Sequence, residues 1–214
     1  MIGIIDYGMG NLHSVASACA YLNLPALISS DPNELAKCDK LILPGVGAFG
    51  DMEKILRETG LDAWIKDQVL VHKTPLLGIC LGMQALFEKS YEFGEYEGLG
   101  FLEGEVTRME PVCFHDQDKK IVLPVPQIGW NRLHTSTDFP IYETIEADPY
   151  VYFDHSYLAA KWNPADLVAY AQYGPYTVPA VVMKNNVMGC QFHPEKSGPT
   201  GLSILEWFGK EFCS

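Results

Sequence analysis

The chain has 214 residues, of which 48% are hydrophobic and 20% are charged. This composition excludes an intrinsically disordered chain, and the length suits one domain over residues 1–214. The 27 acidic residues outnumber the 15 basic residues and give a net charge of −12, so we expect neither a nucleic acid nor an anionic membrane as a partner. The sequence has no signal-peptide pattern and no apolar run of transmembrane length, so we expect a cytoplasmic protein with free thiols.

The first half of the chain alternates short apolar runs with segments of helical periodicity. The apolar runs predict buried strands over residues 2–6, 41–43 and 76–79. Apolar residues at helical spacing predict helical turns within residues 12–22, 52–69 and 83–87. Because continuous apolar strands joined by helices form parallel sheets that are covered on both faces, we expect an α/β fold with a central, mostly parallel sheet.

The second half has shorter runs that are rich in aromatic residues and separated by turn signals. We predict strands over residues 105–109, 150–153, 167–173, 180–184 and 187–192, and a closing helix from about residue 200. Asn185-Asn186 has the composition of a tight hairpin turn, so this half adds a smaller antiparallel portion. Five prolines lie between Pro111 and Pro149, so we expect mostly irregular chain over residues 110–149.

The strongest functional motif is Gly78-Ile79-Cys80-Leu81-Gly82, between a predicted strand and a predicted helix. Glycines two residues before and two residues after a nucleophile are typical of a nucleophile elbow, where neighbouring chain comes too close for a Cβ. The elbow strains the backbone at its central residue and places that side chain at a helix N-terminus, which favours a thiolate. A buried, inert thiol is the alternative, but the paired glycines favour Cys80 as a nucleophile.

A cysteine nucleophile needs a general base, and the base needs a group that orients it. His193 ends the apolar run 187–192, and Glu195 lies two residues further on. Residues two apart on an extended segment point to one side, so we expect Glu195 to reach the ring of His193. His155 is the rival base, but its neighbour Asp154 would point to the opposite face of the strand. A surface turn at 193–195 is the alternative without function.

Acyl transfer also needs donors for the oxyanion. In an elbow, the backbone N–H of Leu81 is one such donor. The loop Pro44-Gly45-Val46-Gly47 follows the strand at 41–43, and its glycines allow backbone amides to turn toward a ligand. We therefore expect the second donor from this loop.

Other readings of the sequence are weaker. Gly8-Met9-Gly10 follows the first strand, but a dinucleotide fingerprint would need glycine where His13 stands, and no phosphate-binding loop motif is present. Cys190 and His193 have metal-like spacing without a second pair of ligands, so we expect no metal and no cofactor. We expect the five cysteines other than Cys80 to fill the core as free thiols.

Together these motifs resemble the class I, or triad, glutamine amidotransferases, which implies their flavodoxin-like fold. The signatures that match are Gly78-Ile79-Cys80-Leu81-Gly82-Met83-Gln84 and His193-Pro194-Glu195. Further stretches are similar to the glutaminase-subunit family of imidazole glycerol phosphate synthase: Asp6-Tyr7-Gly8-Met9-Gly10-Asn11-Leu12, Leu43-Pro44-Gly45-Val46-Gly47-Ala48-Phe49, Ile128-Gly129-Trp130-Asn131 and His193-Pro194-Glu195-Lys196-Ser197. The resemblance runs from the first strand to the last helix. Asp154 departs from it, since relatives usually carry an apolar residue there.

The resemblance implies a role for each matching position. Cys80 would attack the carboxamide of L-glutamine and form a thioester, His193 would carry the proton, and Glu195 would orient His193. The residues that would bind or border glutamine are Gln84, Glu92, His155, Ser156 and Tyr157. The oxyanion donors would be the backbone N–H of Leu81 and the backbone near Val46 and Gly47. Asn11, Trp130 and Lys196 would approach a partner subunit.

That partner, by resemblance, is a (β/α)8-barrel cyclase that receives the ammonia and makes imidazole glycerol phosphate and aminoimidazole carboxamide ribotide in histidine biosynthesis. The length leaves no room for an acceptor domain in this chain, which is consistent with a heterodimer. Three other hypotheses stay open from the residues alone. They are the glutaminase subunit of another class I amidotransferase, a stand-alone thiol hydrolase, and a binding module without catalysis.

Overall fold

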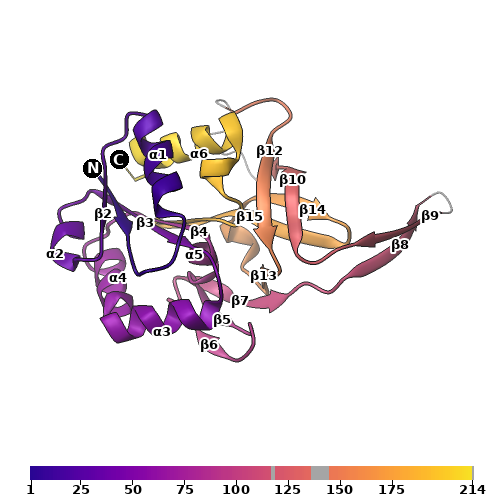
Figure 1. Cartoon of the computed structure of the whole chain (residues 1–214), viewed down its shortest axis with the longest axis horizontal. Coiled ribbons are helices and arrows are strands. Elements are labelled where there is room, and N and C mark those ends of the chain that lie inside the picture. Colours follow the sequence, from indigo (N-terminus) through magenta and orange to yellow (C-terminus); the bar gives the residue numbers. More distant parts are fainter. Residues whose placement is uncertain (117–118, 136–144, 214) are drawn as a thin grey trace.

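Parallel strands form the centre of the protein (Figure 1). The structure is a computed structural model, and it describes residues 1–116, 119–135 and 145–213. The strand order is β2-β1-β3-β4-β16. Their bounds are β1 (Ile2–Ile5), β2 (Ala26–Ser29), β3 (Lys40–Gly45), β4 (Leu76–Cys80) and β16 (Val187–Cys190). Every residue of β1, β3, β4 and β16 is buried, as continuous apolar strands in a doubly covered sheet require.

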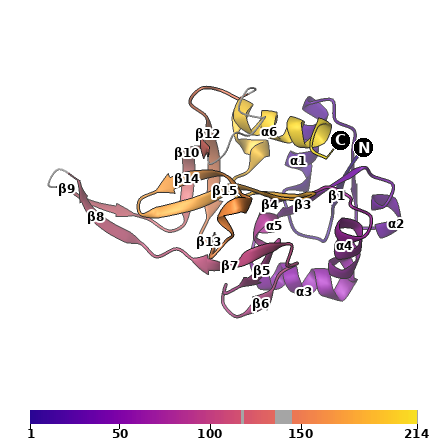
Figure 2. The same cartoon turned by 180° about the vertical axis from the view of Figure 1, so that it is seen from behind.

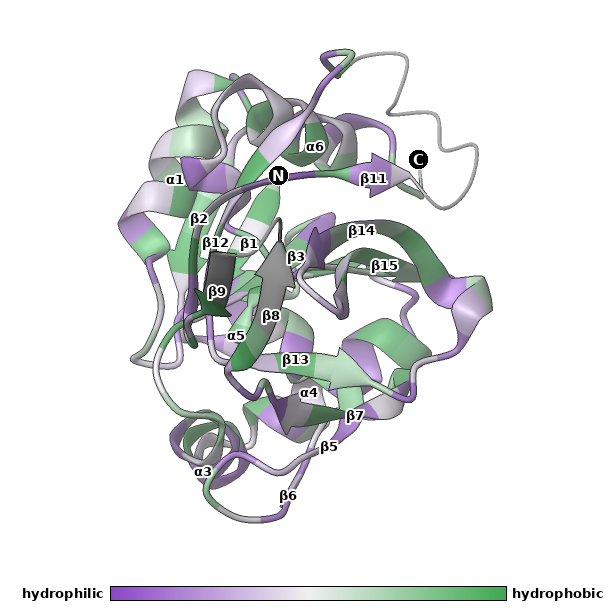
Figure 3. Cartoon of the chain, turned by 90° about the vertical axis from the view of Figure 1, so that its right-hand side faces the viewer, coloured by the Kyte–Doolittle hydropathy of each residue, from purple (hydrophilic) through white to green (hydrophobic). Residues whose placement is uncertain are grey.

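An antiparallel extension continues the same sheet beyond β16. It consists of β15 (Tyr176–Lys184), β14 (Leu167–Tyr173) and β11 (His134–Thr135). The turn between β15 and β16 is Asn185-Asn186, with Asn185 at a φ of 54°, so the predicted hairpin is confirmed. In Figure 3, β14 and β15 are coloured mainly as hydrophobic, in keeping with their burial.

Helices cover both faces of the central sheet, and each face has its own apolar core (Figures 1 and 2). One face carries α1 (Leu12–Tyr21) and α6 (Gly198–Lys210). The other carries α2 (Pro32–Leu35), α3 (Phe49–Thr59) and α4 (Leu61–Leu70). The predicted α/β fold, with a mostly parallel central sheet and a smaller antiparallel part, is therefore confirmed.

Smaller sheets lie beside this core. One contains β13 (Tyr157–Ala160), β7 (Leu102–Arg108), β5 (Phe87–Ser90) and β6 (Tyr96–Glu97). The antiparallel pair β10 (Gln127–Arg132) and β12 (Tyr150–His155) lies against the site described below. The pair β8 (Val112–Asp116) and β9 (Lys119–Leu123) projects from the body as an arm (Figures 1 and 2).

The expectation of mostly irregular chain over residues 110–149 was wrong for the part that the structure describes, because β8, β9, β10 and β11 lie there. Residues 117–118 and 136–144 of that stretch lie outside the described part. The prolines of this stretch lie outside the strands: Pro111 precedes β8, and Pro124 and Pro126 lie between β9 and β10. They therefore do not interrupt the hydrogen bonds between paired strands.

Two local predictions also need correction. The helix expected over residues 83–87 is the four-residue α5 (Leu81–Gln84), and Phe87 begins β5 instead. A short apolar run has no periodicity that separates a buried helix from a buried strand, and here pairing of β5 with β7 decided the outcome. The edge strand β2 was not predicted; its apolar run of three residues is short, and Ala26, Leu27 and Ile28 are exposed or only partly buried.

Candidate active site

Cys80 lies at the turn between β4 and α5, with a φ of 54° and a ψ of −109°. This strained conformation is rare outside glycine and is what a nucleophile elbow requires. A Cβ on Gly78 would lie 2.6 Å from the carbonyl oxygen of Gly82, and a Cβ on Gly82 would lie 1.8 Å from that of Leu43. The tight turn of the elbow itself therefore demands glycine at 78, and its close packing against β3 demands glycine at 82.

Three neighbouring parallel strands bring the candidate residues together, because β3, β4 and β16 end at the same edge of the sheet. The loop with Val46 and Gly47 follows β3, Cys80 ends β4, and the chain after β16 leads to His193. The carboxyl edge of such a sheet is where ligand sites of open α/β folds form.

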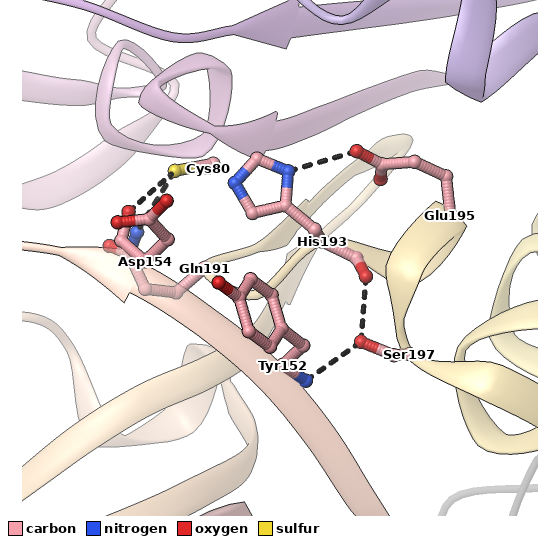
Figure 4. Close-up of polar contacts among 7 residues, drawn as sticks. All are labelled: Cys80, Tyr152, Asp154, Gln191, His193, Glu195 and Ser197. Atoms are coloured by element: carbon pink, nitrogen blue, oxygen red, sulfur yellow. Dashed lines mark hydrogen bonds and ion pairs between the residues drawn. The ribbon is translucent and has the colours of Figure 1, made fainter. Parts of the chain in front are cut away.

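His193 and Glu195 are in direct contact, with Nδ1 of the imidazole 2.9 Å from Oε1 of the carboxylate (Figure 4). Their side chains are only 4% and 0% exposed. The expected contact is present, but the expected geometry was wrong. Glu195 does not continue an extended strand; it lies on the 3-10 helix η3 (Pro194–Lys196), whose turn folds the carboxylate back onto the ring.

Hydrogen bonds to the backbone hold His193 in place (Figure 4). Its N–H donates to the carbonyl of Tyr152 at 3.0 Å, and its carbonyl accepts from the hydroxyl of Ser197 at 2.6 Å. The same hydroxyl accepts from the N–H of Tyr152 at 2.9 Å. Ser197 thus ties the histidine segment to β12, a role that the sequence analysis did not assign.

The electrostatic surroundings of His193 favour its charged form. Burial lowers the pKa of His193, but hydrogen bonds and charge interactions with Cys80 and Glu195 outweigh it and raise that pKa to about 10. Figure 4 shows the imidazole between the sulfur and the carboxylate. The arrangement can therefore keep a protonated imidazole beside the sulfur of Cys80, which pairs a nucleophile with a proton donor.

A cleft of about 430 Å³ opens above Cys80 and His193. The residues singled out from the sequence that line it are Val46, Gly47, Leu81, Gln84, Glu92, His155, Ser156, Tyr157 and Lys196. Glu195 does not line the cleft, because it lies buried behind His193. Phe93, Arg108, Pro126 and Asp154 also line it and were not assigned to the site from the sequence.

His155, the rival base, has a different environment from His193. Its Nδ1 lies 2.8 Å from the carbonyl oxygen of Tyr157, so Nδ1 carries the hydrogen and Nε2 is bare. Burial, with a smaller effect of His193, lowers the pKa of His155 to about 4. Asp154 is exposed on the opposite face of β12, as the alternation of strand residues predicts. No carboxylate among the described residues orients this ring.

Gln84 lies on α5 one turn after Cys80, and both of its amide hydrogens are in use. Its Nε2 donates to the carbonyl of Tyr157 at 2.9 Å and to Oε1 of Gln191 at 3.1 Å. Gln191 in turn donates from Nε2 to the sulfur of Cys80 at 3.8 Å. Gln191 was not predicted from the sequence, although it lies two residues before His193 and strand alternation places it on the same side.

Glu92 closes another part of the cleft and contacts the start of α3. Its Oε2 accepts from the backbone N–H of Phe49 at 2.7 Å, where the positive end of the helix dipole favours a carboxylate. Burial nevertheless raises the pKa of Glu92. The carboxylate is thus held in place at the N-terminus of α3 and lines the cleft with its charge.

The three residues expected to meet a partner occupy different settings. Trp130 is 53% exposed on β10, not in a loop as expected, and its ring packs edge-on against Tyr152 at 6.1 Å. Lys196 is exposed at the cleft. Asn11 precedes α1 and is half-buried.

All six cysteines are free. Cys19, Cys38 and Cys190 are buried as expected, whereas Cys113 and Cys213 are exposed and do not fill the core. The described part of the chain holds no cluster of three or more histidine, cysteine or acidic side chains that could bind a metal ion. Within that part, every helix is too short or too polar to cross a membrane.

Comparisons with known proteins agree with this geometry. A family profile described as "Glutamine amidotransferase class-I" matches residues 3–212. The chain is 50% identical over 205 residues to "Imidazole glycerol phosphate synthase subunit HisH" of Geobacillus thermodenitrificans, covering 96% of this chain and 93% of the relative. It is 48% identical over 210 residues to the protein of the same name from Bacillus subtilis, covering 98% and 96%.

Solved structures show the same fold at low sequence identity. A "Crystal structure of glutamine amidotransferase" superposes with a TM-score of 0.72 and 20% identity, covering 97% of each chain. The "Structure of PurLQS from Thermotoga maritima" superposes with a TM-score of 0.65 and 18% identity, covering 97% of this chain and 96% of that chain.

Proposed function

Because the chain belongs to the class I glutamine amidotransferases and, within them, to the family of HisH subunits, we propose that it is the glutaminase subunit of imidazole glycerol phosphate synthase. It hydrolyses L-glutamine to glutamate and delivers the ammonia to a cyclase subunit that makes imidazole glycerol phosphate. The observation that carries the chemistry is the buried set in which His193 contacts both Cys80 and Glu195.

The first half of the reaction forms a thioester. The thiolate of Cys80 attacks the carboxamide carbon of glutamine, and the carbonyl oxygen becomes an oxyanion. The imidazolium of His193 gives its proton to the departing nitrogen, so that ammonia leaves and the Cys80 thioester remains. Glu195 holds the ring and offsets its charge while it is protonated.

The second half restores the enzyme. His193, now neutral, takes a proton from water, and the resulting hydroxide attacks the thioester carbon. Collapse of this second tetrahedral intermediate breaks the C–S bond and releases glutamate. The backbone N–H of Leu81 and the backbone near Val46 and Gly47 stabilise the oxyanion in both halves. Gly47, at a φ of 94°, lies in a loop whose peptide can reorient.

The cleft offers groups for both ends of the substrate. With both amide hydrogens of Gln84 used inside the protein, its Oε1 is the atom left to accept a hydrogen bond from glutamine. Glu92 lines the same cleft with a carboxylate, which suits the substrate ammonium. His155, Ser156 and Tyr157 border the substrate from β12 and β13.

The acceptor chemistry belongs to a separate partner in this proposal. Residues 1–214 form one glutaminase domain, and a cyclase subunit completes the synthase. The docking surface includes exposed Trp130 on β10, Lys196 at the cleft and Asn11 before α1. No cofactor enters the glutaminase reaction, because every proton and electron pair is supplied by the triad, glutamine and water.

The test is release of glutamate by the purified chain, alone and with an added cyclase subunit and its nucleotide ligand. We expect the complex to release glutamate much faster than the chain alone. Cys80→Ser abolishes the activity, whereas Cys113→Ser, at an exposed cysteine of the β8–β9 arm, retains it. Full activity of Cys80→Ser would contradict the mechanism, and equal rates with and without the cyclase would contradict the coupling.

A further inference from the structure

Gln191 is a fully buried glutamine, 0% exposed, directly after β16. Its backbone N–H donates to the carbonyl of Ala180 at 3.0 Å, which anchors the residue to β15. Its side-chain amide lies between two residues of the site: its oxygen accepts from Gln84. Its Nε2 donates to the sulfur of Cys80 (Figure 4). A buried amide is stable only when both of its ends have hydrogen-bond partners, so this placement is specific.

The carbonyl group of Tyr157 determines which atom donates and which accepts in each of these hydrogen bonds. The oxygen of Tyr157 can only accept, so Gln84 must turn its Nε2 toward it. The second hydrogen on that nitrogen meets Gln191, which must therefore present its Oε1. The Nε2 of Gln191 is then left facing the sulfur of Cys80, as a donor and not as an acceptor.

The two protonation states of Cys80 use different partners. A thiol can donate, and the carbonyl oxygen of Asp154 lies 3.9 Å from the sulfur to accept. A thiolate can only accept, and the Nε2 of Gln191 lies 3.8 Å from the sulfur on the buried side. Hydrogen bonds to an ionised partner are stronger than those between neutral groups. The amide of Gln191 therefore favours the thiolate over the thiol.

We propose that Gln191 is a positioning residue for Cys80, which holds the sulfur as a thiolate aimed into the cleft and connects it to Gln84. A ligand that donates a hydrogen bond to the Oε1 of Gln84 polarises the two linked side-chain amides of Gln84 and Gln191. Binding of such a ligand in the cleft therefore strengthens the hydrogen bond from Gln191 to the sulfur. This second part rests on the proposed function, because it takes glutamine as the ligand at Gln84. The first part needs only the geometry.

The first test measures the rate at which iodoacetamide alkylates Cys80 as a function of pH. Peptide mass spectrometry separates Cys80 from the exposed Cys113 and Cys213. In Gln191→Met, of similar size but without a donor, we expect the pH midpoint of alkylation to rise by about one unit, the scale of one charge-assisted hydrogen bond. Gln191→Glu, which replaces the donor by an acceptor, should raise it at least as far.

The matched control is Gln68→Met, which removes a buried glutamine of α4 that bonds to Thr74 away from the cleft. It should lower the stability without moving the alkylation midpoint. If Gln191→Met does not fold, the same-shaped Gln191→Glu carries the measurement. A midpoint within about 0.2 units of the wild type in the folded variant overturns the proposal.

The second test is glutamate release by the complex with the cyclase subunit. In Gln191→Met we expect kcat to fall about tenfold with a smaller change in KM. The effects of Gln84→Met and Gln191→Met should not be additive in kcat/KM, since both break one chain of hydrogen bonds. Strict additivity would overturn the connection to Gln84. Because alkylation needs neither glutamine nor the partner, its outcome stands even if the glutaminase assay shows no activity.

Discussion

Oε1 of Glu195 lies 2.9 Å from Nδ1 of His193, and only Pro194 separates the two residues in the chain. The contact exists because the chain turns into η3 directly after His193, and both side chains are excluded from solvent. In such a place the carboxylate acts strongly on the ring, since water does not screen the charge.

Replacing Glu195 by glutamine keeps an acceptor for Nδ1 and removes the negative charge. We expect the glutaminase rate of Glu195→Gln to fall on the order of 10³-fold, because the imidazolium loses its counter-charge. The pKa of His193, raised to about 10 in the wild type, should fall. Histidine NMR titration measures that pKa, and an unchanged value would contradict the assignment of Glu195.

The same pKa predicts how stability changes with pH. The folded-state pKa of His193, about 10, lies above the ordinary value of 6.5, so its contribution is complete below pH 6.5 and is lost as the pH rises toward 10. Urea denaturation across this range should show a smaller loss in Glu195→Gln than in the wild type. An equal loss in both proteins would argue against the charge pair.

The buried His155 should make the protein less stable as the pH falls, which is the opposite of the effect of His193. Burial lowers the pKa of His155 from the ordinary 6.5 to about 4. Between these pH values the unfolded chain binds a proton at His155 that the folded protein does not bind. We expect the wild type to lose up to about 3 kcal/mol as the pH falls from 6.5 to 4, and His155→Gln to lose less. His72→Gln, at an exposed histidine, is the control and should follow the wild type.

Glu92 and Glu88 form a matched pair for testing the substrate site. Both carboxylates accept a backbone N–H, Glu92 from Phe49 and Glu88 from Gly104, but of the two only Glu92 lines the cleft. We expect Glu92→Gln to fold and to raise KM for glutamine about tenfold or more, through loss of charge next to the substrate ammonium. Glu88→Gln should leave KM unchanged, and an equal rise in both would refute the role of Glu92.

Gly82 tests the packing of the elbow. A Cβ there would overlap the carbonyl oxygen of Leu43, so Gly82→Ala should lower the free energy of unfolding by about 3 kcal/mol or more. Gly100→Ala is the control, because its Cβ meets no atom within 4 Å and adds only the strain of a φ of 71°, about 1 kcal/mol. Urea denaturation measures the free energy of unfolding of both variants. A similar decrease in both would contradict the steric argument.

Trp130 tests the docking surface. Its ring is 53% exposed on β10, and truncation of an exposed aromatic anchor at an interface weakens binding strongly. We expect Trp130→Ala to raise the Kd for the cyclase subunit about 30-fold. Loss of the edge-on contact with Tyr152 should lower the stability of the free chain by only about 1 kcal/mol. Tyr21→Ala, at a 75% exposed tyrosine that ends α1, is the control. Unchanged affinity of Trp130→Ala in titration calorimetry would exclude this surface.

Local chemistry made the elbow and the inner strands predictable. Glycines at 78 and 82 around Cys80 specify a tight strand-to-helix turn within five residues. Strands β1 and β4, and β3 after Lys40, lack charged residues because both faces of the sheet are covered. These features depend on sterics and burial that act over a few neighbouring residues, so the sequence by itself determined them.

Pairing between distant segments decided the rest. Residues 127–132 became β10 because their backbone pairs with the distant strand β12, which no local pattern encodes. Residues 112–116 and 119–123 pair with each other as β8 and β9. Glu195 reaches His193 through a 3-10 turn, and Gln191 reaches Cys80 only because β16 lies beside β4. The sequence determined which residues carry the chemistry, whereas the tertiary structure decided their distances and protonation, since burial and long-range contacts set both.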